Sequence, residues 1–357
     1  MSFDPNAAAA GDGVFGLPHT PDEARVVLVP VPFEATTSYG GGTAHGPRAI
    51  LAASRQVDLY DHETGTPYES GIAMLHESAS MRTWSEEGGS LAREFRALRD
   101  ANEAASRYPG RDMMEAQSLQ ARVNGLCGQL NAALQAQVRA LVGRGKIVGT
   151  VGGDHGAVFG AIAAHAEQFP GLGILHFDAH ADLRHEYEGF TWSHASIMNN
   201  VIRRLPGVAR LVQVGIRDFC AEERDLVRDS GGRIRSFYDA DMARARFAGA
   251  TFKSQVDAIV AELPAQVYVS FDIDGLDPAL CPNTGTPVPG GLSFQEASYL
   301  LGAVAHSGRR IIGFDLVEVA PDAAGGEWDA NVGARLLYKL IGWTLVSQAP
   351  GGAIAAH

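Results

Sequence analysis

The sequence predicts an α/β fold in which a parallel β-sheet is covered by helices on both faces. Short β-branched runs alternate along the chain with amphipathic or Ala-rich segments, which is the pattern of strand–helix units. The apolar runs are continuous, as in strands that are buried on both faces. We find no internal repeat and no low-complexity linker that divides the 357 residues, so one large domain is expected.

Six apolar runs are the expected strands. They are Val26–Val29, Ile147–Val151, Gly173–Phe177, Arg210–Val214, Val267–Phe271 and Ile311–Val317. Helices are expected between several of them, at Gly156–Gln168, Thr251–Glu262 and Ser293–His306. Residues 1–24 are rich in Gly, Ala and Pro, so we expect an N-terminal arm there, either loose or packed on a neighbouring subunit. Residues 25–357 would then form a single domain.

A helical insertion is expected at about residues 90–144, broken once at Tyr108-Pro109-Gly110. Apolar residues recur in it at spacings of three and four, which indicates one long helix with a single apolar stripe. The stripe consists of Leu119, Val123, Leu126, Leu130, Leu134, Val138 and Leu141. Because a single stripe is a packing surface, we expect a helical pair laid on the sheet, or an oligomer contact, in preference to a catalytic role.

Composition excludes several classes of partner. The net charge of −12 argues against nucleic acid and against an anionic membrane surface, since both require concentrated Lys and Arg. The apolar runs are far shorter than the ~20 residues of a membrane span. Three widely spaced cysteines suit a reducing compartment, and the N-terminus lacks the pattern of an export signal. A cytoplasmic protein is therefore expected.

Residues of the metal-ligand type follow three of the expected strands. His155 lies in VGGDH, Asp178, His180 and Asp182 lie in FDAHAD, and Asp272 and Asp274 lie in FDID. In an extended segment every second side chain points the same way, so an alternating triplet can converge on one point. The carboxyl ends of strands are also the edge at which open α/β sheets bind ligands.

This set of ligands suits a pair of metal ions. Two imidazoles and four carboxylates are more than one ion needs, and four negative charges roughly neutralise two divalent cations. The donor set favours Mn²⁺, with Ni²⁺, Co²⁺ or Zn²⁺ as other candidates. Such a pair lowers the pKa of a shared water and polarises the group that this water attacks. Each motif alone has a structural explanation as a turn or a solvated loop, but three clusters in this order favour a hydrolytic centre.

The motifs VGGDH, FDAHAD and SFDIDGLDP, together with GFDLVEVAP, resemble those of the arginase/agmatinase ureohydrolase family. VPFEATTSYGGGTAHGPRAI resembles the agmatinase branch more than the arginase branch. The resemblance covers most of residues 25–345. It implies an arginase-like three-layer α/β/α fold with about eight parallel strands, two Mn²⁺ per subunit, and a homotrimer or homohexamer. It also implies hydrolysis of a guanidino group to an amine plus urea.

The resemblance also implies a role for each matching residue. Asp178 and Asp272 would bridge the ions, His155 and Asp182 would complete one coordination shell, and His180 and Asp274 would complete the other. Glu318 would clamp the guanidinium, a role that chemistry supports independently because a carboxylate matches the forked donors of that planar cation. His194, in FTWSHASIMNN, would transfer a proton and orient the substrate. The expected catalytic residues are therefore His194, Glu318 and Asp182.

This chain departs from the family pattern after His194, where Ala195 and Ile197 replace the usual Gly and Pro. The departure concerns the substrate pocket more than the metals. His194 has a structural alternative, as a residue before a helix that Ser196 helps to start. Glu318 has one as well, as an ordinary surface residue after a strand.

The segment Leu183–Ser193, here called the pocket loop, should line the pocket entrance because it joins the metal triplet to His194. Arg184 is expected either to bind a substrate carboxylate as a fork or to pair with Glu186 or Glu188. Trp192 is expected either to stack on a planar cation or to be buried. The DLR run at Asp182 also resembles formimidoylglutamase, which acts on an amidine-bearing acid.

The sequence therefore predicts a hydrolase of non-peptide C–N bonds in linear amidines, acting on an agmatine-like guanidino compound or a guanidino acid. One alternative, favoured by Arg184, is a formimidoylglutamase-type enzyme that releases formamide. A second is a catalytically silent metal-binding relative, favoured by the changed residues after His194 and by the helical insertion. A mononuclear deacetylase of similar fold would not need His155 or Asp274.

Overall fold

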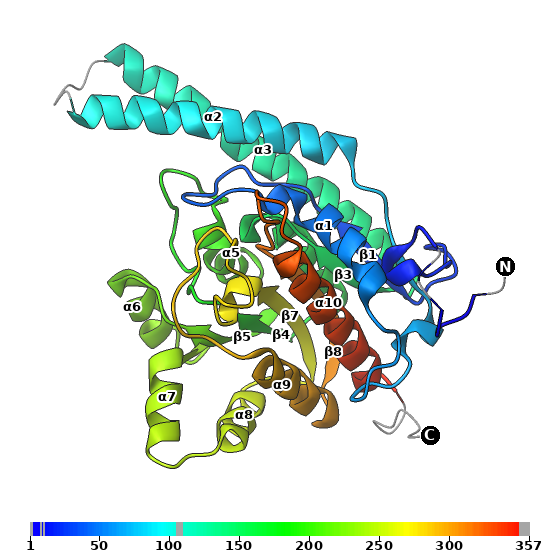
Figure 1. Ribbon diagram of the computed structural model, residues 1–357. Coiled ribbons are helices and arrows are strands. Elements are labelled where there is room, and N and C mark those ends of the chain that lie inside the picture. Colours follow the sequence, from blue (N-terminus) through cyan, green and yellow to red (C-terminus); the bar gives the residue numbers. More distant parts are fainter. Residues whose placement is uncertain (1–2, 8, 10, 105–109, 350–357) are drawn as a thin grey trace.

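The computed structural model contains one eight-stranded sheet in the order β2-β1-β3-β8-β7-β4-β5-β6, with every neighbouring pair parallel (Figure 1). The structure describes residues 3–7, 9, 11–104 and 110–349. The strands are β1 (Val26–Pro30), β2 (Ile72–Met74), β3 (Ile147–Val151), β4 (Leu172–Phe177), β5 (Val208–Ile216), β6 (Ile234–Tyr238), β7 (Gln266–Asp272) and β8 (Arg310–Val317). The predicted parallel α/β fold is confirmed.

All six predicted strands are present, and the two that sequence reasoning missed are the edge strands β2 and β6. β2 has only three residues, too few for a recognisable pattern. β6 reads IRSFY, and only its first residue is buried. An edge strand pairs on one side and is covered less, so it does not need the continuous apolar run by which a central strand is recognised.

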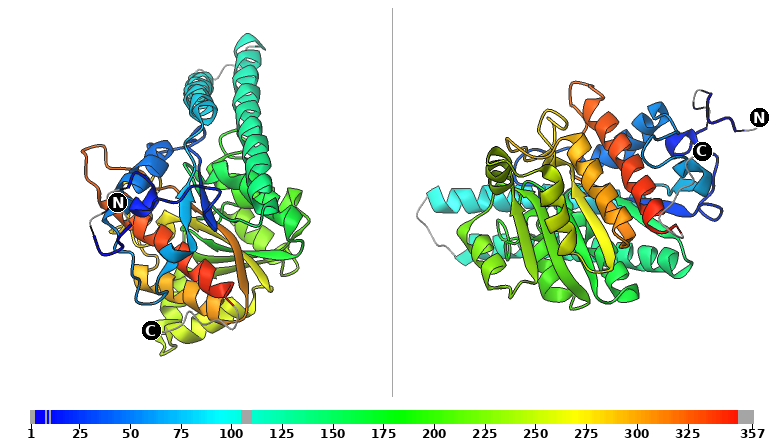
Figure 2. Two further views of the ribbon diagram at one scale, coloured as in Figure 1. Left: turned by 90° about the vertical axis from the view of Figure 1, so that its right-hand side faces the viewer. Right: turned by 90° about the horizontal axis from the view of Figure 1, so that it is seen from below.

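Helices cover both faces of this sheet (Figure 2). One hydrophobic cluster joins the strands to α1 (Gly46–Ala53), α8 (Phe252–Ala261), α9 (Phe294–His306) and α10 (Trp328–Ser347). Two further clusters join the strands to α3 (Gly110–Gly143), α4 (Phe159–Gln168) and α5 (Ile197–Arg204). α6 (Ala221–Asp229) and α7 (Asp239–Phe247) flank β6.

The predicted helices at α4, α8 and α9 are all found, and two of them are capped by the side chain of the residue directly before the helix. Thr251 accepts a hydrogen bond from the Ser254 N–H at the start of α8. Ser293 and Glu296 form a capping box at the start of α9. α10 was not anticipated, because apolar residues surround most of it and leave no clear polar stripe.

A helical hairpin of α2 (Ala79–Ala104) and α3 runs side by side and projects beyond the sheet (Figures 1 and 2). α2 begins at Ala79, earlier than the predicted segment. Of the predicted break, Tyr108 and Pro109 lie outside the described residues, and Gly110 begins α3. The seven residues of the apolar stripe on α3 are buried. They belong to a cluster that also contains residues of β1, β3 and α4, so this face of the hairpin packs on the rest of the fold.

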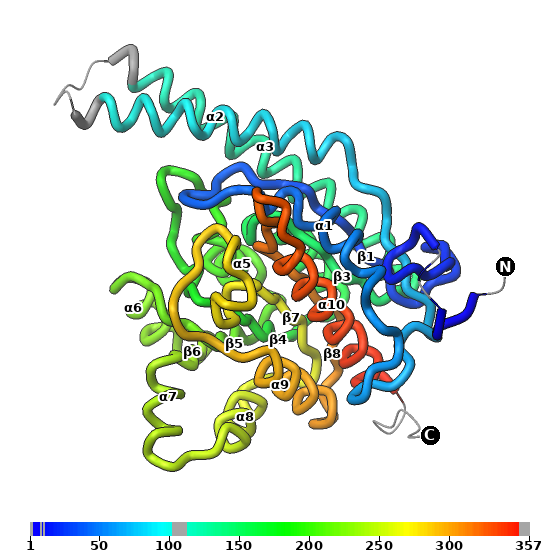
Figure 3. The backbone as a smooth tube through the Cα atoms, in the orientation of Figure 1, coloured from blue at the N-terminus to red at the C-terminus, as the bar shows by residue number. Residues whose placement is uncertain are grey.

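The described part of the N-terminal arm packs on its own chain, beside α1 and α10 (Figure 3). The Phe15 ring lies edge-on to Tyr338 of α10 at 4.8 Å between centroids, and its N–H donates to Ser54 Oγ at 2.9 Å. This part of the arm is therefore not loose, because Val14, Phe15 and Leu17 have apolar partners within the same chain; a contact with a neighbouring subunit stays a prediction. In the described part of the chain, no helix combines the length and apolarity needed to cross a membrane.

Candidate metal centre

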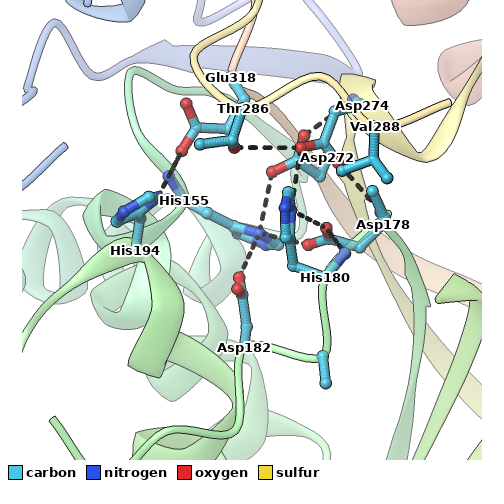
Figure 4. Close-up of polar contacts among 12 residues, drawn as sticks. His155, Asp178, His180, Asp182, His194, Asp272, Asp274, Thr286, Val288 and Glu318 are labelled. Carbon is cyan, nitrogen blue, oxygen red and sulfur yellow. Dashed lines mark hydrogen bonds and ion pairs between the residues drawn. The ribbon is translucent and has the colours of Figure 1, made fainter. Parts of the chain in front are cut away.

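The four central strands β3, β8, β7 and β4 end at one edge of the sheet and bring the predicted site residues together (Figure 4). β3 is followed by the segment that carries His155, and β4 by the segment from Asp178 to Asp182. Asp272 is the last residue of β7, and Asp274 follows it. Glu318 comes directly after β8. Parallel pairing of neighbouring strands therefore assembles the cluster from distant parts of the sequence.

The ligand atoms form two groups that share Asp178. His155 Nδ1 lies 3.1 Å from Asp178 Oδ2, 3.1 Å from Asp182 Oδ2 and 3.3 Å from Asp272 Oδ2. His180 Nδ1 lies 3.1 Å from Asp274 Oδ2 and 3.4 Å from Asp178 Oδ1. Asp178 thus directs one carboxylate oxygen to each group, which is the arrangement that a ligand bridging two cations requires. The cluster fits a dinuclear metal centre.

The charges of this cluster also call for cations. All four carboxylates are buried, and no described Lys or Arg forms an ion pair with any of them. Burial and the neighbouring Asp178 raise the pKa of Asp182 to about 7, and burial together with Asp274 raises that of Asp272 well above its usual range. Burial opposes protonation of His180, but Asp274 and Asp178 raise its pKa to about 12. Protons thus stand in for the positive charge that bound cations supply.

Hydrogen bonds behind the cluster fix which nitrogen of His155 faces it. The Ser270 hydroxyl on β7 donates to Asp315 Oδ1 on β8 at 2.9 Å, and lies 3.0 Å from His155 Nε2. Because that hydroxyl hydrogen points to Asp315, the Ser270 oxygen must accept from His155 Nε2–H. His155 Nδ1 then faces the three carboxylates. Burial opposes protonation of this ring, but hydrogen bonds to Asp178, Asp182 and Asp272 raise its pKa well above the usual range, so Nδ1 carries a proton that a bound cation would replace. Metal-binding histidines are commonly oriented by such a bond on the other ring nitrogen.

His176 is a residue of the site that sequence reasoning missed. Gln213 donates through Nε2 to the Ala181 carbonyl at 2.7 Å, which fixes the amide orientation, and the same nitrogen lies 3.0 Å from His176 Nδ1. His176 Nδ1 is therefore the acceptor, and its Nε2–H donates to Asp178 Oδ2 at 2.8 Å. Although His176 lies close enough to join a ligand group, this bonding makes it a donor to a ligand. The alternation through residues 176, 178, 180 and 182 was the signal that could have revealed it.

Two site residues have left-handed backbone conformations, which cost about 1–2 kcal/mol in residues other than glycine. They are Asp182, with φ of 55°, and Glu318, with φ of 61°. Surrounding bonds hold both: the Asp182 carbonyl accepts from Met198 N–H at 3.0 Å, and Glu318 N–H donates to the Gly153 carbonyl at 2.9 Å. Glu318 Oε1 also accepts from His155 N–H at 2.8 Å. The fold therefore aims these carboxylates at the cluster at the expense of local strain.

His194 is buried beside Glu318, at the rim of the cluster. Its Nδ1 lies 3.8 Å from Glu318 Oε1 and its Nε2 lies 3.2 Å from Ser38 Oγ. Burial, with His180 and His155 nearby, lowers the pKa of His194 to about 3, so the imidazole is neutral near pH 7. The short 3-10 helix that begins at His194 is capped by Ser193, whose Oγ accepts from Ala195 N–H. Ser196 occupies the N-cap position of α5, as predicted, but its side chain makes no capping hydrogen bond.

Glu318 is buried between His155 and His194, which rules out the alternative of a surface residue. Burial and the nearby Asp154 raise its pKa well above the usual range. A cation placed beside this carboxyl would favour its ionised form. The geometry therefore provides a buried acceptor that suits a guanidinium next to the predicted metal ions.

Arg184 and Trp192 of the pocket loop contact other side chains of the protein. The Arg184 guanidinium lies 4.9 Å from the Tyr187 ring centroid and 3.8 Å from Glu223, so the suggested pairing with Glu186 or Glu188 is wrong. Trp192 packs edge-on against Phe159 at 5.0 Å, and the Arg204 guanidinium lies 4.7 Å from its ring centroid. The planar cation beside Trp192 is thus the guanidinium of Arg204, which supports the alternative that Trp192 has a structural role.

Comparison with known proteins agrees with the fold and the motifs. A sequence model of the Arginase family matches residues 24–342. N(1)-aminopropylagmatine ureohydrolase of Thermus thermophilus is 35% identical over 332 residues, which are 92% of this chain and 94% of that protein. The protein of the same name from Synechocystis is 32% identical over 333 residues, or 91% of each chain. The crystal structure of agmatine ureohydrolase of Thermoplasma volcanium shares the fold with a TM-score of 0.68, at 22% identity, over 97% of this chain and 95% of that one.

Proposed function

Because the chain belongs to the arginase family, we propose that it is a metal-dependent ureohydrolase that cleaves a guanidino compound to an amine and urea. One observation carries the proposal: six buried or half-buried ligand-type side chains converge in two groups around Asp178, with Glu318 and His194 at the rim (Figure 4). A catalytically silent relative would have no need of this complete set.

His155, Asp178, Asp182 and Asp272 would hold one cation, and His180 and Asp274 would hold the second with Asp178 and Asp272. Mn²⁺ is the preferred metal, with Ni²⁺ or Co²⁺ as substitutes, because the donors are mainly carboxylates with one imidazole for each ion. When bound, such a pair supplies Lewis acidity and ionises water near neutral pH.

Glu318 and His194 would act on the substrate. Glu318 binds the guanidinium through a charge-assisted hydrogen bond and so holds the carbon over the ligand cluster. His194 Nδ1 lies 3.8 Å from Glu318 Oε1, so it is placed to relay a proton to the departing amine. Its lowered pKa means that the ring would hold this proton only transiently and release it readily. Ser38 holds the opposite nitrogen of His194 and so sets the orientation of the ring.

The far end of the substrate is proposed to carry an amine in place of an acid. The relatives in the comparison are named for agmatine and for N(1)-aminopropylagmatine. Arg184 was the main feature that favoured a carboxylate, but its guanidinium lies 4.9 Å from the Tyr187 ring centroid and 3.8 Å from Glu223, whose charge opposes a second carboxylate there. This placement also weakens the formimidoylglutamase alternative. We further propose a cytoplasmic homotrimer or homohexamer, which light scattering on the purified protein tests for subunit number.

The test is a product assay on protein loaded separately with Mn²⁺ and Ni²⁺. The panel contains N(1)-aminopropylagmatine, agmatine, guanidinobutyrate, arginine and formimidoylglutamate, with urea and formamide measured independently. We expect urea from the amine-ended compounds, and loss of turnover with unchanged metal content in Glu318→Gln. Formamide from formimidoylglutamate would support the second candidate. No product from any compound, in protein that holds two ions per chain, would overturn the proposal in favour of a silent relative.

A further inference from the structure

The hairpin α2–α3 contacts both segments that flank His194, and Arg96 on α2 joins them. Arg96 Nε donates to Glu188 Oε2 of the pocket loop at 2.5 Å. Its Nη2 donates to the carbonyl of Thr36 at 3.0 Å. Less than a fifth of either charged side chain in this pair is exposed, so solvent screens the interaction less than at an open surface. A single guanidinium therefore bridges two segments that lie far apart in the sequence.

The tip of the pocket loop is a strained turn that this contact stabilises. Tyr187 and Phe190 exchange backbone hydrogen bonds of 3.2 and 2.9 Å around a two-residue connection. The connecting residues, Glu188 and Gly189, have φ of 51° and 87°, as a type I′ turn requires. Glycine adopts this conformation freely, whereas glutamate does so at a cost of about 1–2 kcal/mol. The ion pairs of Glu188 with Arg96 and, at 3.5 Å, with Arg99 offset that cost.

Further residues of the hairpin hold the same tip. The Gln120 side chain of α3 donates to the Gly189 carbonyl. Asn124 Oδ1 of α3 accepts from Thr191 N–H at 3.0 Å. The Phe95 ring of α2 lies 5.2 Å from Phe190. The hairpin thus contacts each residue from 188 to 191, which is more than a covering helix needs for burial alone.

Both segments also reach His194. Ser38, two residues beyond Thr36, lies 3.2 Å from His194 Nε2. The Tyr187 ring, next to Glu188, lies 6.4 Å from the imidazole. A displacement of either segment would therefore move a neighbour of the imidazole next to Glu318.

We propose that Arg96 is a positioning residue that keeps these two segments together over His194, and that the helical hairpin serves to present it. The role in turnover rests on the proposed ureohydrolase function. Arg96 touches neither the metal-ligand cluster nor Glu318 in the described structure, so its loss should leave metal binding intact. The same loss should loosen the turn at residues 187–190.

The experiment compares Arg96→Ala with Arg96→Lys and with Arg93→Ala, a control on an exposed arginine of the same helix. In Arg96→Ala we expect kcat/KM for the best substrate to fall about 10- to 100-fold, since small misplacements near a reacting centre have effects of that order. Metal content should not change. Arg96→Lys should recover part of the loss, because an ammonium can replace one of the two bonds. Arg93→Ala should match the wild type.

Amide hydrogen exchange at residues 187–190 gives a readout that is independent of turnover. Exchange there should accelerate in Arg96→Ala but not in Arg93→Ala. Wild-type exchange in Arg96→Ala overturns the proposal, whether or not activity changes. If Arg96→Ala does not fold, Glu188→Gln, which keeps the size of the side chain but removes its ion pairs with Arg96 and Arg99, should show faster exchange for the same reason. If the wild-type protein releases no urea, the proposed ureohydrolase function is refuted. The exchange rates then test only whether Arg96 holds the turn at residues 187–190.

Discussion

Replacing Ser270 by alanine should weaken metal binding without unfolding the protein. Ser270 is fully buried on β7, and its hydroxyl accepts from His155 Nε2–H while donating to Asp315. Metal binding requires a neutral His155 ring with its proton on Nε2, and without this acceptor that tautomer loses the hydrogen bond that favours it over the Nδ1–H form, which Asp178, Asp182 and Asp272 accept. A metal ion must then displace that proton before it can bind.

The size of the effect follows from the bond that is lost. A buried donor without an acceptor costs about 1–3 kcal/mol, and about 1.4 kcal/mol corresponds to a tenfold change in affinity. We therefore expect metal affinity to fall about 10- to 100-fold, the range found when partners of ligating histidines are removed. The effect should be confined to the ion that His155 binds.

The assay is competition with a chelator of known affinity, which gives the dissociation constant for each ion. Ser298→Ala is the matched control, because Ser298 is equally buried and its hydroxyl is hydrogen-bonded to Glu63 and Trp343, far from the cluster. The control should bind metal like the wild type. Equal affinities for Ser270→Ala and wild type would show that the serine does not set the ring orientation of His155.

Three further predictions follow from particular contacts. Gln213→Leu removes the donor to His176, so metal affinity should fall about tenfold in the same chelator assay. An unchanged affinity would show that the hydrogen bonding of His176 does not influence metal binding. Leu134→Ala opens a cavity in the fully buried stripe of α3, so the free energy of unfolding should fall by about 2–5 kcal/mol in chemical denaturation, with metal affinity preserved. Metal-free protein should lose stability between about pH 4 and about pH 12, because the pKa values of Asp182, raised from 3.8 to about 7, and of His180, raised from 6.5 to about 12, mean that the folded state holds protons that the unfolded state releases across this range. Melting temperatures of chelator-treated protein that stay constant or rise across this range would contradict the last prediction, whereas loading with Mn²⁺ should reverse the trend since its ligands must be deprotonated.

The central strands and the ligand clusters could be recognised from sequence because their signals are local. A strand buried on both faces must be apolar throughout, and alternation along one strand brings Asp178, His180 and Asp182 to one side. β2 and β6 lacked that signal because edge strands are short or partly exposed. The contact of the arm with its own chain was not predicted, because nothing in residues 1–24 indicates that Phe15 meets Tyr338, more than 300 positions along the chain.

Sequence patterns determined the parallel sheet and the edge at which the ligand-type residues gather, since those properties depend on residue type and periodicity. Only the tertiary structure decided which nitrogen of His155 faces the cluster, why His176 belongs to it, and that Arg184 and Trp192 are occupied by other side chains. Such choices depend on distances between segments that are remote in sequence. They are settled when neighbouring strands, the pocket loop and the hairpin α2–α3 pack together, because a buried polar group takes the partner that the fold places within reach.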